Sequence, residues 1–358
     1  MQRIASVVAI AALLLAAPVQ ARASAGIESS TPFTQMRTML REAAHAAPGR
    51  VAMEIRDLST GETSAFNGDL DMPAASTIKI PVMVEVFRQM QAGKFDLNRR
   101  VEVLPQDKDW GSGSLCDAPV GSTFPVSRLL SEMITVSDNT AANMLIRLVG
   151  RSHINRTMAR LGLQHTQLKD YIHTAGWNVR TTLRTTPNDM VMLLTKMAND
   201  RLIDSWSSKQ MIAILEADQI NTLLPAELPD IPIAHKTGSF SDTLNDVGIV
   251  YSPGSPYVIA VMTTDLPTLN QGRSFIRKVS KLAYHGLTHF AKWRLANGLD
   301  VPIAAAAEAA PVRAASVTTD EPMWGAATAA PSSAPSASPS PAASPSPASG
   351  TASGIRAR

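Results

Sequence analysis

The sequence predicts an α+β fold: one antiparallel sheet formed by strands near both ends of the folded region and packed with helices, plus an inserted all-helical lobe. Two observations lead to this prediction. Stretches rich in β-branched and apolar residues occur early and return late, and the residues between them carry helical apolar spacing. The predicted strands are Val51–Asp57, Glu62–Asn67, Ile233–Thr237, Asp246–Ser252 and Tyr257–Thr263.

The remaining elements follow from local patterns. The turn Leu58-Ser59-Thr60-Gly61 joins the first two strands into a hairpin. A long apolar helical stretch begins near Ser76 and runs to about Ala92. Further helices are predicted at Phe33–Ala46, Val126–Ile134, Asn139–Val149, Ile154–Leu161, Pro187–Ala198 and Gly272–Leu295.

Residues 1–23 have the pattern of a secretory signal peptide. Arg3 supplies the positive start, Val7–Ala17 the apolar run and Ala21-Arg22-Ala23 a small-residue cleavage site. The apolar run is shorter than the roughly 20 residues that span a bilayer. The sequence therefore predicts export to the periplasm or the medium, without stable membrane insertion.

Two further segments follow the signal. Residues 30–297 are long enough for a large hydrophobic core and form the predicted catalytic domain. Residues 302–358 differ in composition, and 331–349 contain only Pro, Ser and Ala. Such a tract buries too little apolar surface to offset the entropy of ordering it, so a disordered tail is predicted.

Charge and cysteine content exclude several functions. Loss of Arg3 and Arg22 with the signal lowers the net charge from +3 to +1, and no basic block suggests a nucleic-acid partner. The single cysteine, Cys116, leaves no intramolecular disulfide. No His/Cys cluster has metal-ligand spacing and no Gly-rich loop suggests phosphate, so neither metal nor cofactor is expected. We expect a monomer that acts on a small molecule.

The first chemical motif is Ser76-Thr77-Ile78-Lys79. Residues three apart at the start of a helix share one face, so Ser76 and Lys79 lie together. A serine hydroxyl becomes a good nucleophile when a base sits beside it, and a buried lysine can be that base. An N-cap serine followed by a surface lysine would produce the same spacing.

The second motif is Ser137-Asp138-Asn139. The Ser137 hydroxyl can relay a proton to a leaving amine, and the Asn139 amide can bind a substrate carbonyl. Asp138 is better suited to holding the loop. A helix N-cap alone would also explain Asp and Asn at this position.

The third motif, Lys236-Thr237-Gly238-Ser239, ends a predicted strand. Lys236 raises the local positive potential, and the Thr237 hydroxyl can bind a carboxylate. Gly238 allows backbone to approach substrate closely. The amide of Ser239 can pair with that of Ser76 as an oxyanion hole. An ordinary turn after a strand is the alternative.

In this order and on these elements, the three motifs resemble those of class A β-lactamases and penicillin-binding proteins. The resemblance to the class A family covers essentially all of 30–297. It is reinforced by Thr140-Ala141-Ala142-Asn143, Thr185-Thr186-Pro187 and His235 before Lys236. It implies Ser76 as nucleophile, Lys79 as its activator, Ser137 as proton shuttle, Asn139 as the amide site, and Lys236 with Thr237 as the carboxylate site.

One element of that family is missing. Relatives place a deacylating glutamate in an Ω-shaped loop, but no glutamate occurs between Glu132 and Glu216. The gaps in the match assign its place to Ile172 or His173. His173 and Asp170 are the candidate bases, against the alternatives of an ordinary loop histidine and a solvated acid.

A second departure concerns the carboxylate site. Many relatives carry an arginine on the strand after the third motif, where this chain has Leu244-Asn245-Asp246-Val247-Gly248. Arg273 is a candidate replacement. Trp110 beside Gly111 is a candidate wall of the cleft entrance, and core burial of its indole is the alternative.

The expected function is therefore serine acyl transfer that opens a β-lactam amide through an acyl-enzyme on Ser76, with slow or atypical deacylation. Two other functions stay open. One is a DD-peptidase or esterase acting on cell-wall peptides. The other is a penicillin-binding sensor or trap that stays acylated.

Overall fold

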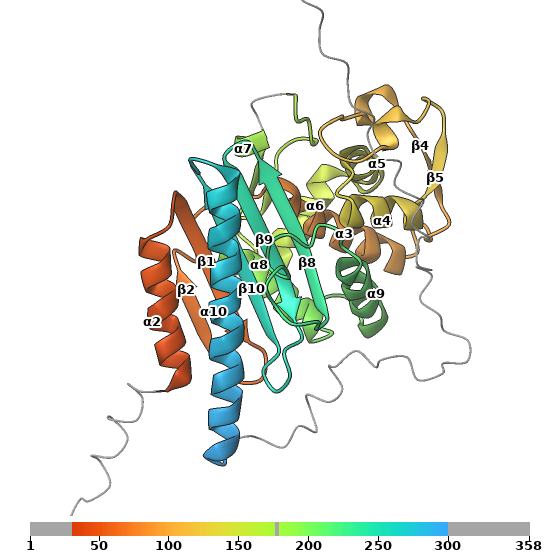
Figure 1. The fold of residues 1–358 in the computed structure, drawn as a ribbon. Helices are drawn as coiled ribbons and strands as arrows, with labels where there is room; N and C mark the ends of the chain where they lie inside the picture. The colour runs from red at the N-terminus through yellow and green to blue at the C-terminus, as the bar shows by residue number, and fades with distance from the viewer. Residues whose placement is uncertain (1–30, 176–178, 300–358) are drawn as a thin grey trace, which may run out of the picture.

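The computed structural model describes residues 31–175 and 179–299. The predicted signal peptide at 1–23 and the predicted tail at 302–358 lie outside the described residues. At the centre is a five-stranded antiparallel sheet in the order β2-β1-β10-β9-β8 (Figure 1). Its strands are β1 (Arg50–Asp57), β2 (Thr63–Phe66), β8 (Ile233–Phe240), β9 (Thr243–Val250) and β10 (Tyr257–Thr264).

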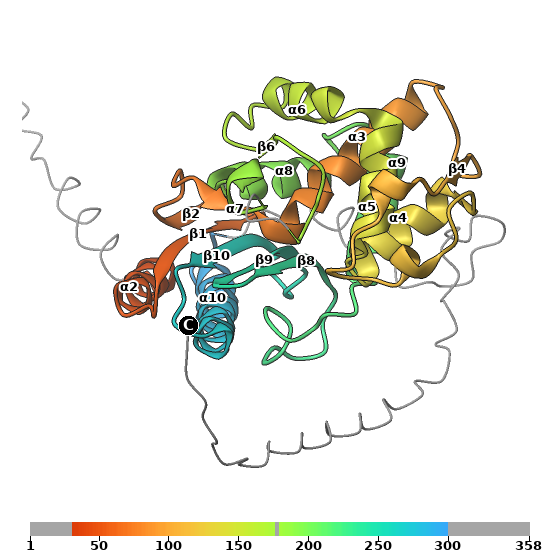
Figure 2. The ribbon, with the colours of Figure 1, turned by 90° about the horizontal axis from the view of Figure 1, so that it is seen from above.

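Helices cover both faces of this sheet. α2 (Pro32–His45) and α10 (Leu269–Ala296) pack together on one face, and α8 (Pro187–Ala198) lies on the other (Figure 2). A core that includes Phe33 and Leu40 of α2 and Ile276 and Leu287 of α10 fills the first face. The N- and C-terminal parts of the described chain therefore build one layer of the fold.

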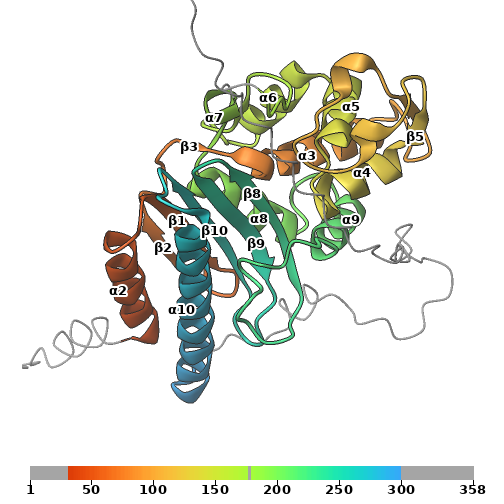
Figure 3. The same cartoon turned by 45° about the horizontal axis from the view of Figure 1, so that its top comes forward.

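The helical lobe lies beside β8, the edge strand (Figure 3). It shares a second, larger core that includes Phe87, Leu130 and Leu145. Its helices are α3 (Lys79–Gln91), α4 (Val126–Thr135), α5 (Asn139–Val149), α6 (Arg151–Arg160) and α9 (Ser205–Glu216).

Short elements complete the fold. Two small antiparallel sheets have the orders β4-β5 and β3-β7-β6. They consist of β3 (Met72–Pro73), β4 (Arg100–Glu102), β5 (Thr123–Pro125), β6 (Gln167–Leu168) and β7 (Leu183–Thr185). The single-turn pieces are η2 (Ala75–Ile78), η3 (Pro105–Asp107), η4 (Leu115–Asp117) and α7 (Val179–Thr182).

The predicted α+β architecture is confirmed. The bounds of α5 and α8 agree with the prediction, because each helix has a side-chain N-cap: Asp138 accepts from the Ala141 amide, and Thr186 accepts from the Asp189 amide ahead of Pro187. Some predicted bounds need correction: the stretch from Ser76 begins as the 3₁₀ turn η2 before α3, and the strand predicted at Asp246–Ser252 is β9 at Thr243–Val250. Helix α9 was not predicted.

No helix among residues 31–175 and 179–299 is long and apolar enough to cross a membrane.

Asn245 of β9 ties the sheet to the segment that leads into η2. Its side-chain amide donates to the carbonyl oxygens of Pro73 at 2.8 Å and Ala74 at 3.1 Å, and its carbonyl oxygen accepts from the Thr263 amide at 3.0 Å. The side chain is fully buried. Asn245 therefore has a structural role within the stretch 244–248.

We expect Asn245→Ala to lower the free energy of unfolding by about 2–4 kcal/mol, since buried backbone groups lose their partners. Urea denaturation followed by circular dichroism measures the change. Asn98→Ala, at an exposed position, is the matched control and should leave stability within about 0.5 kcal/mol. Equal stability of the two variants would contradict this role of Asn245.

Candidate active site

A cleft of about 210 Å³ lies where the helical lobe meets β8. Five of the eight residues predicted for catalysis and substrate binding line it: Ser76, Ser137, Asn139, Thr237 and Ser239. Lys79, Lys236 and Gly238 are buried next to these residues in the chain. The structure therefore brings the three motifs to one place, although 160 residues separate Ser76 from Lys236.

Ser76 lies in η2 at the start of the α3 segment and is half-buried. No side-chain hydrogen bond engages its hydroxyl within the described parts of the chain. Ala75 before it has a φ of 47°, a left-handed conformation that is strained for a residue with a Cβ. The serine is thus held on a strained turn with its hydroxyl free to react.

The Lys79 ammonium is completely buried and has three acceptors. It donates to the Ser137 carbonyl oxygen at 2.5 Å, to Ser137 Oγ at 3.1 Å and to Asn139 Oδ1 at 2.7 Å. Burial, and then the charge of Lys236, lower the pKa of Lys79 well below its ordinary value. A lysine with a lowered pKa can be neutral enough to accept a proton near neutral pH.

The loop before α5 presents the second motif. Ser137 has a φ of 60°, and Asp138 beside it is fully buried. Asp138 accepts from the Ala141 amide at 2.8 Å and from the Leu115 amide at 2.8 Å. Asp138 therefore caps α5 and fixes the loop, so that Ser137 and Asn139 both face Lys79.

Lys236 of β8 is also completely buried, and Asp218 is its ion-pair partner. The two side chains are 3.5 Å apart, Nζ to Oδ2, which is at the upper limit for a hydrogen bond, so the contact is at most a weak one. Burial lowers the pKa of Lys236 although Asp218 opposes the shift. A buried ammonium without a hydrogen-bond acceptor among the described residues can bind an anionic group. The sequence analysis missed Asp218, because this residue lies in the loop after α9, a helix that was not predicted, and is distant from Lys236 in the sequence.

His235 precedes Lys236 and forms a second buried pair beneath the site. Its Nδ1 lies 3.0 Å from Asp246 Oδ1, and its Nε2 lies 3.0 Å from Asn221 Oδ1. Burial opposes a charge on the ring, but the Asp246 carboxylate outweighs it and raises the pKa of His235. Asp246 also accepts from the Leu224 amide at 2.9 Å. This network holds the strand that carries Lys236.

Gly238 sits where β8 passes closest to η2. A Cβ at this position would lie 3.0 Å from the Ala74 carbonyl oxygen and 3.0 Å from the Ser76 amide nitrogen. Even a methyl group here would be in tight contact with the backbone of the turn. The glycine keeps the backbone of Ser239, which lines the cleft, near that of Ser76.

In the segment 170–174, neither candidate for the deacylating base lies at the cleft. Ile172 lines the cleft, and Asn143 holds its backbone by donating to its carbonyl oxygen at 2.9 Å and accepting from its amide at 2.8 Å. His173 is exposed, and the half-exposed Asp170 pairs with Arg151 at 3.0 Å. Among the described residues that line the cleft, neither His173 nor Asp170 is present.

Of the two further residues suggested for the cleft, Arg273 and Trp110, only Arg273 of α10 is among the residues that line it. Trp110 is 70% exposed, so its indole is not part of the core. No cluster of three or more His, Cys, Asp or Glu side chains suited to a metal occurs in the described residues.

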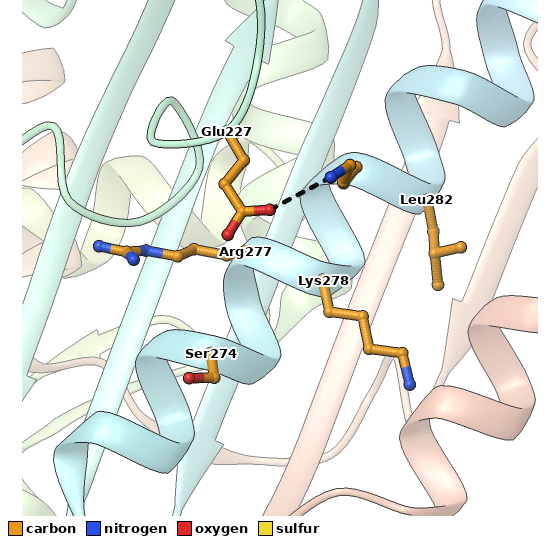
Figure 4. Close-up of a pocket in the computed structure, with 6 residues that line it drawn as sticks. Glu227, Ser274, Arg277, Lys278 and Leu282 are labelled. Carbon is orange, nitrogen blue, oxygen red and sulfur yellow. Dashed lines mark ion pairs between the residues drawn. The ribbon is translucent and has the colours of Figure 1, made fainter.

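A second hollow lies between α10 and the loop before β8 (Figure 4). Its lining includes Glu227, Arg277, Lys278 and Lys281, and Lys281 pairs with Glu227 at 3.6 Å. It contains none of the predicted catalytic residues.

Fold and site together define a serine hydrolase of the class A β-lactamase-like type. A model described as Beta-lactamase enzyme family matches residues 35–287, and the chain belongs to this family. The β-lactamase VEB-1 of Pseudomonas aeruginosa is 23% identical over 259 residues, covering 67% of this chain and 86% of VEB-1.

Solved structures agree with this assignment. A β-lactamase from Sphaerobacter thermophilus is 32% identical with a TM-score of 0.66, covering 70% of this chain and 95% of that one. PBP-A is 29% identical with a TM-score of 0.67, covering 71% and 96%. The chain is thus similar both to β-lactamases and to a protein named PBP-A.

The two buried lysines provide a test of the site electrostatics. We expect Lys236→Met to raise the pKa of Lys79, because the second cation that disfavours its charge is removed. Titration of ¹³C-labelled lysine side chains by NMR measures this pKa directly. Lys281→Met, at an exposed lysine, is the control and should leave the Lys79 titration unchanged. An unchanged Lys79 pKa in Lys236→Met would contradict the coupling.

Proposed function

We propose that this protein opens the amide of a β-lactam through an acyl-enzyme on Ser76, and that deacylation is slow. The observation that carries the proposal is the buried Lys79 ammonium, held between Ser137 and Asn139 one turn from a free serine hydroxyl. A base of lowered pKa beside a nucleophile is what acyl transfer to serine requires.

Acylation follows from this arrangement. Neutral Lys79 accepts the Ser76 proton as the hydroxyl oxygen attacks the lactam carbonyl carbon. The C–N bond of the tetrahedral intermediate then breaks, and the departing nitrogen receives a proton through Ser137. Lys79 lies 3.1 Å from Ser137 Oγ, so the proton can pass from the base to the leaving group.

The remaining roles bind the substrate. The amides of Ser76 and Ser239 would hold the oxyanion, and the close approach at Gly238 supports that pairing. Lys236 and Thr237 would bind the substrate carboxylate, because the buried Lys236 ammonium lacks a hydrogen-bond acceptor in the described chain. Asn139 would bind the substrate amide, with Arg273 as a further cation at the cleft.

Slow deacylation is supported by Ile172. A hydrolytic water needs polar partners and a base, and the residue of this segment that borders the cleft is Ile172, which is apolar and buried. Loss of a positioned base costs about 10²–10⁴-fold in rate. Because Lys79 and Ser137 remain, the loss would fall on deacylation and leave acylation intact.

The relatives fit this proposal. The curated relative is named as the β-lactamase VEB-1. A PBP-A variant with a leucine replaced by glutamate is described as an acyl-enzyme complex with penicillin G, and it is 29% identical to this chain. We propose that this chain forms the same kind of acyl-enzyme. We also propose that it is exported, because residues 1–23 have the pattern of a signal peptide.

A second candidate function is a penicillin-binding protein that stays acylated, and the apolar Ile172 is the observation that favours it. A DD-peptidase or esterase acting on cell-wall peptides would use the same acylation machinery.

Mixing the protein with a chromogenic cephalosporin tests the proposal. We expect a burst close to one equivalent, then slow turnover, and a mass increase on the intact protein that Ser76→Ala abolishes. Acylation should slow as pH falls through the lowered pKa of Lys79, because only the neutral amine accepts the proton. Absence of any adduct, with release of D-alanine from a peptide, would instead assign the peptidase function.

The place of Ile172 generates a further prediction. Since Asn143 holds the backbone on both sides, Ile172→Glu should present a carboxylate to the cleft and accelerate deacylation by about 10²–10⁴-fold, with acylation little changed. Decay of the acyl adduct followed by mass spectrometry measures this.

Three variants serve as controls for Ile172→Glu. Ile172→Gln has a similar shape but no basic group and should not accelerate the decay. His173→Ala and Asp170→Ala should deacylate as the parent protein does. Slower deacylation in either alanine variant would assign the base to that residue and contradict the role given to Ile172.

A further inference from the structure

A buried carboxylate that the sequence analysis did not single out joins three segments of the cleft wall. Asp109 is 4% exposed. Its Oδ1 accepts from the Gly111 amide at 2.9 Å and from Asn139 Nδ2 at 2.7 Å, and its Oδ2 accepts from the Thr174 amide at 2.6 Å. The Thr174 hydroxyl adds a bond at 2.9 Å. Gly111, Asn139 and Thr174 all line the cleft.

Asp109 determines which way the Asn139 amide points. Asn139 Oδ1 accepts from the Lys79 ammonium at 2.7 Å, while Nδ2 donates to Asp109. A rotated amide would set its NH₂ group against the ammonium and its oxygen against the carboxylate, and both contacts would be repulsive. One N–H of Asn139 Nδ2 is bonded to Asp109, and the second N–H remains for a substrate carbonyl. The bond to Asp109 fixes the direction of that second N–H.

The same carboxylate helps to hold the segment that carries Ile172. Asn143 binds the backbone of Ile172 on one side, and Asp109 binds the amide and hydroxyl of Thr174 two residues later. A Cβ on Gly111 would lie 2.2 Å from Thr174 Oγ1, so the two segments are in close contact. With both ends held, the buried Ile172 borders the cleft and His173 is exposed to solvent.

Asp109 is unsuited to act as a general base. A carboxylate has about four lone-pair sites, and Gly111, Asn139 and the two Thr174 donors occupy them. Burial raises the pKa of Asp109, but the Thr174 amide and the other donors outweigh it and the net shift is downward. A saturated carboxylate of lowered pKa holds neighbours in place and does not take up protons near neutral pH.

Asp109 also acts on Lys79 through its charge. The charged groups that influence Lys79 are Lys236 of β8, which lowers its pKa, and Asp138, Asp109 and Asp218, which raise it. Removing the Asp109 charge should therefore lower the pKa of Lys79 further.

We propose that Asp109 is a positioning residue for the acylation reaction, which orients the Asn139 amide toward the substrate and fixes the segment 172–174 against the cleft. This inference rests on the proposed function, because it concerns how the same cleft receives its substrate.

Asp109→Asn tests it, because the new NH₂ group replaces one acceptor oxygen and must lie against an N–H that Asp109 now accepts from, either that of Asn139 or that of Thr174. We expect the second-order rate constant for acylation by a penicillin to fall on the order of 10–100-fold, as a misplaced binding group does. The acidic limb of the acylation profile should move to lower pH, a shift that a merely structural role would not produce. Asp117→Asn, exposed on the same loop, is the matched control and should change neither quantity.

Failure of this inference and failure of the proposed function give different results. An unmodified acylation rate and pH profile in folded Asp109→Asn overturns the inference, whereas a wild-type protein that forms no Ser76 adduct overturns the proposed function instead. If Asp109→Asn does not fold, a crystal structure of the penicillin-acylated wild type decides. Asn139 Nδ2 bonded to both Asp109 and the substrate amide oxygen supports the inference, and an amide rotated away from Asp109 overturns it.

Discussion

Burial of the Lys79 ammonium is the constraint on which the rest of the site depends. An isolated charge in the interior is costly unless polar partners compensate it, and here all three acceptors come from the loop and first turn of α5. The same contacts therefore fasten α3 to α5 and place Ser137 and Asn139 beside the serine. One interaction thus contributes both to the packing of α3 against α5 and to the chemistry of the cleft.

A second buried lysine makes the charge on Lys79 still less favourable. Lys236 lowers the proton affinity of Lys79, and the buried carboxylates Asp138, Asp109 and Asp218 act against it. Three buried carboxylates thus accompany the two buried cations, but Lys236 lies 3.5 Å from its ion-pair partner Asp218 and has no hydrogen bond within the described residues. Under the proposed function, the carboxylate of a substrate would supply that acceptor.

Sequence patterns predicted those features that are encoded locally. The three motifs were found because their residues are adjacent or one turn apart, and α5 and α8 because caps mark their ends. The two- and three-residue strands β3, β6 and β7 carry no period to read. Asp204 caps α9 and was an available signal that the prediction did not use. Asp109 could not be found this way, since its partners Asn139 and Thr174 are 30 and 65 residues distant.

The choice between Ile172 and His173 shows most clearly what sequence alone leaves open. Adjacent residues in an extended segment point in opposite directions, so a shift of one position in the match exchanges a titratable side chain for an apolar one. In the structure Asn143 binds both backbone groups of Ile172, and this buried residue borders the cleft while His173 is exposed and does not. The carboxylates nearby are already committed, Asp109 to four donors and Asp170 to Arg151. In the proposed mechanism a water entering beside the acyl group would therefore find no free carboxylate in this segment, and Lys79, the proposed acceptor of the Ser76 proton, is the base left to activate it. That division separates the two half-reactions: the groups that form the proposed acyl-enzyme are complete, and those that would hydrolyse it rapidly are not.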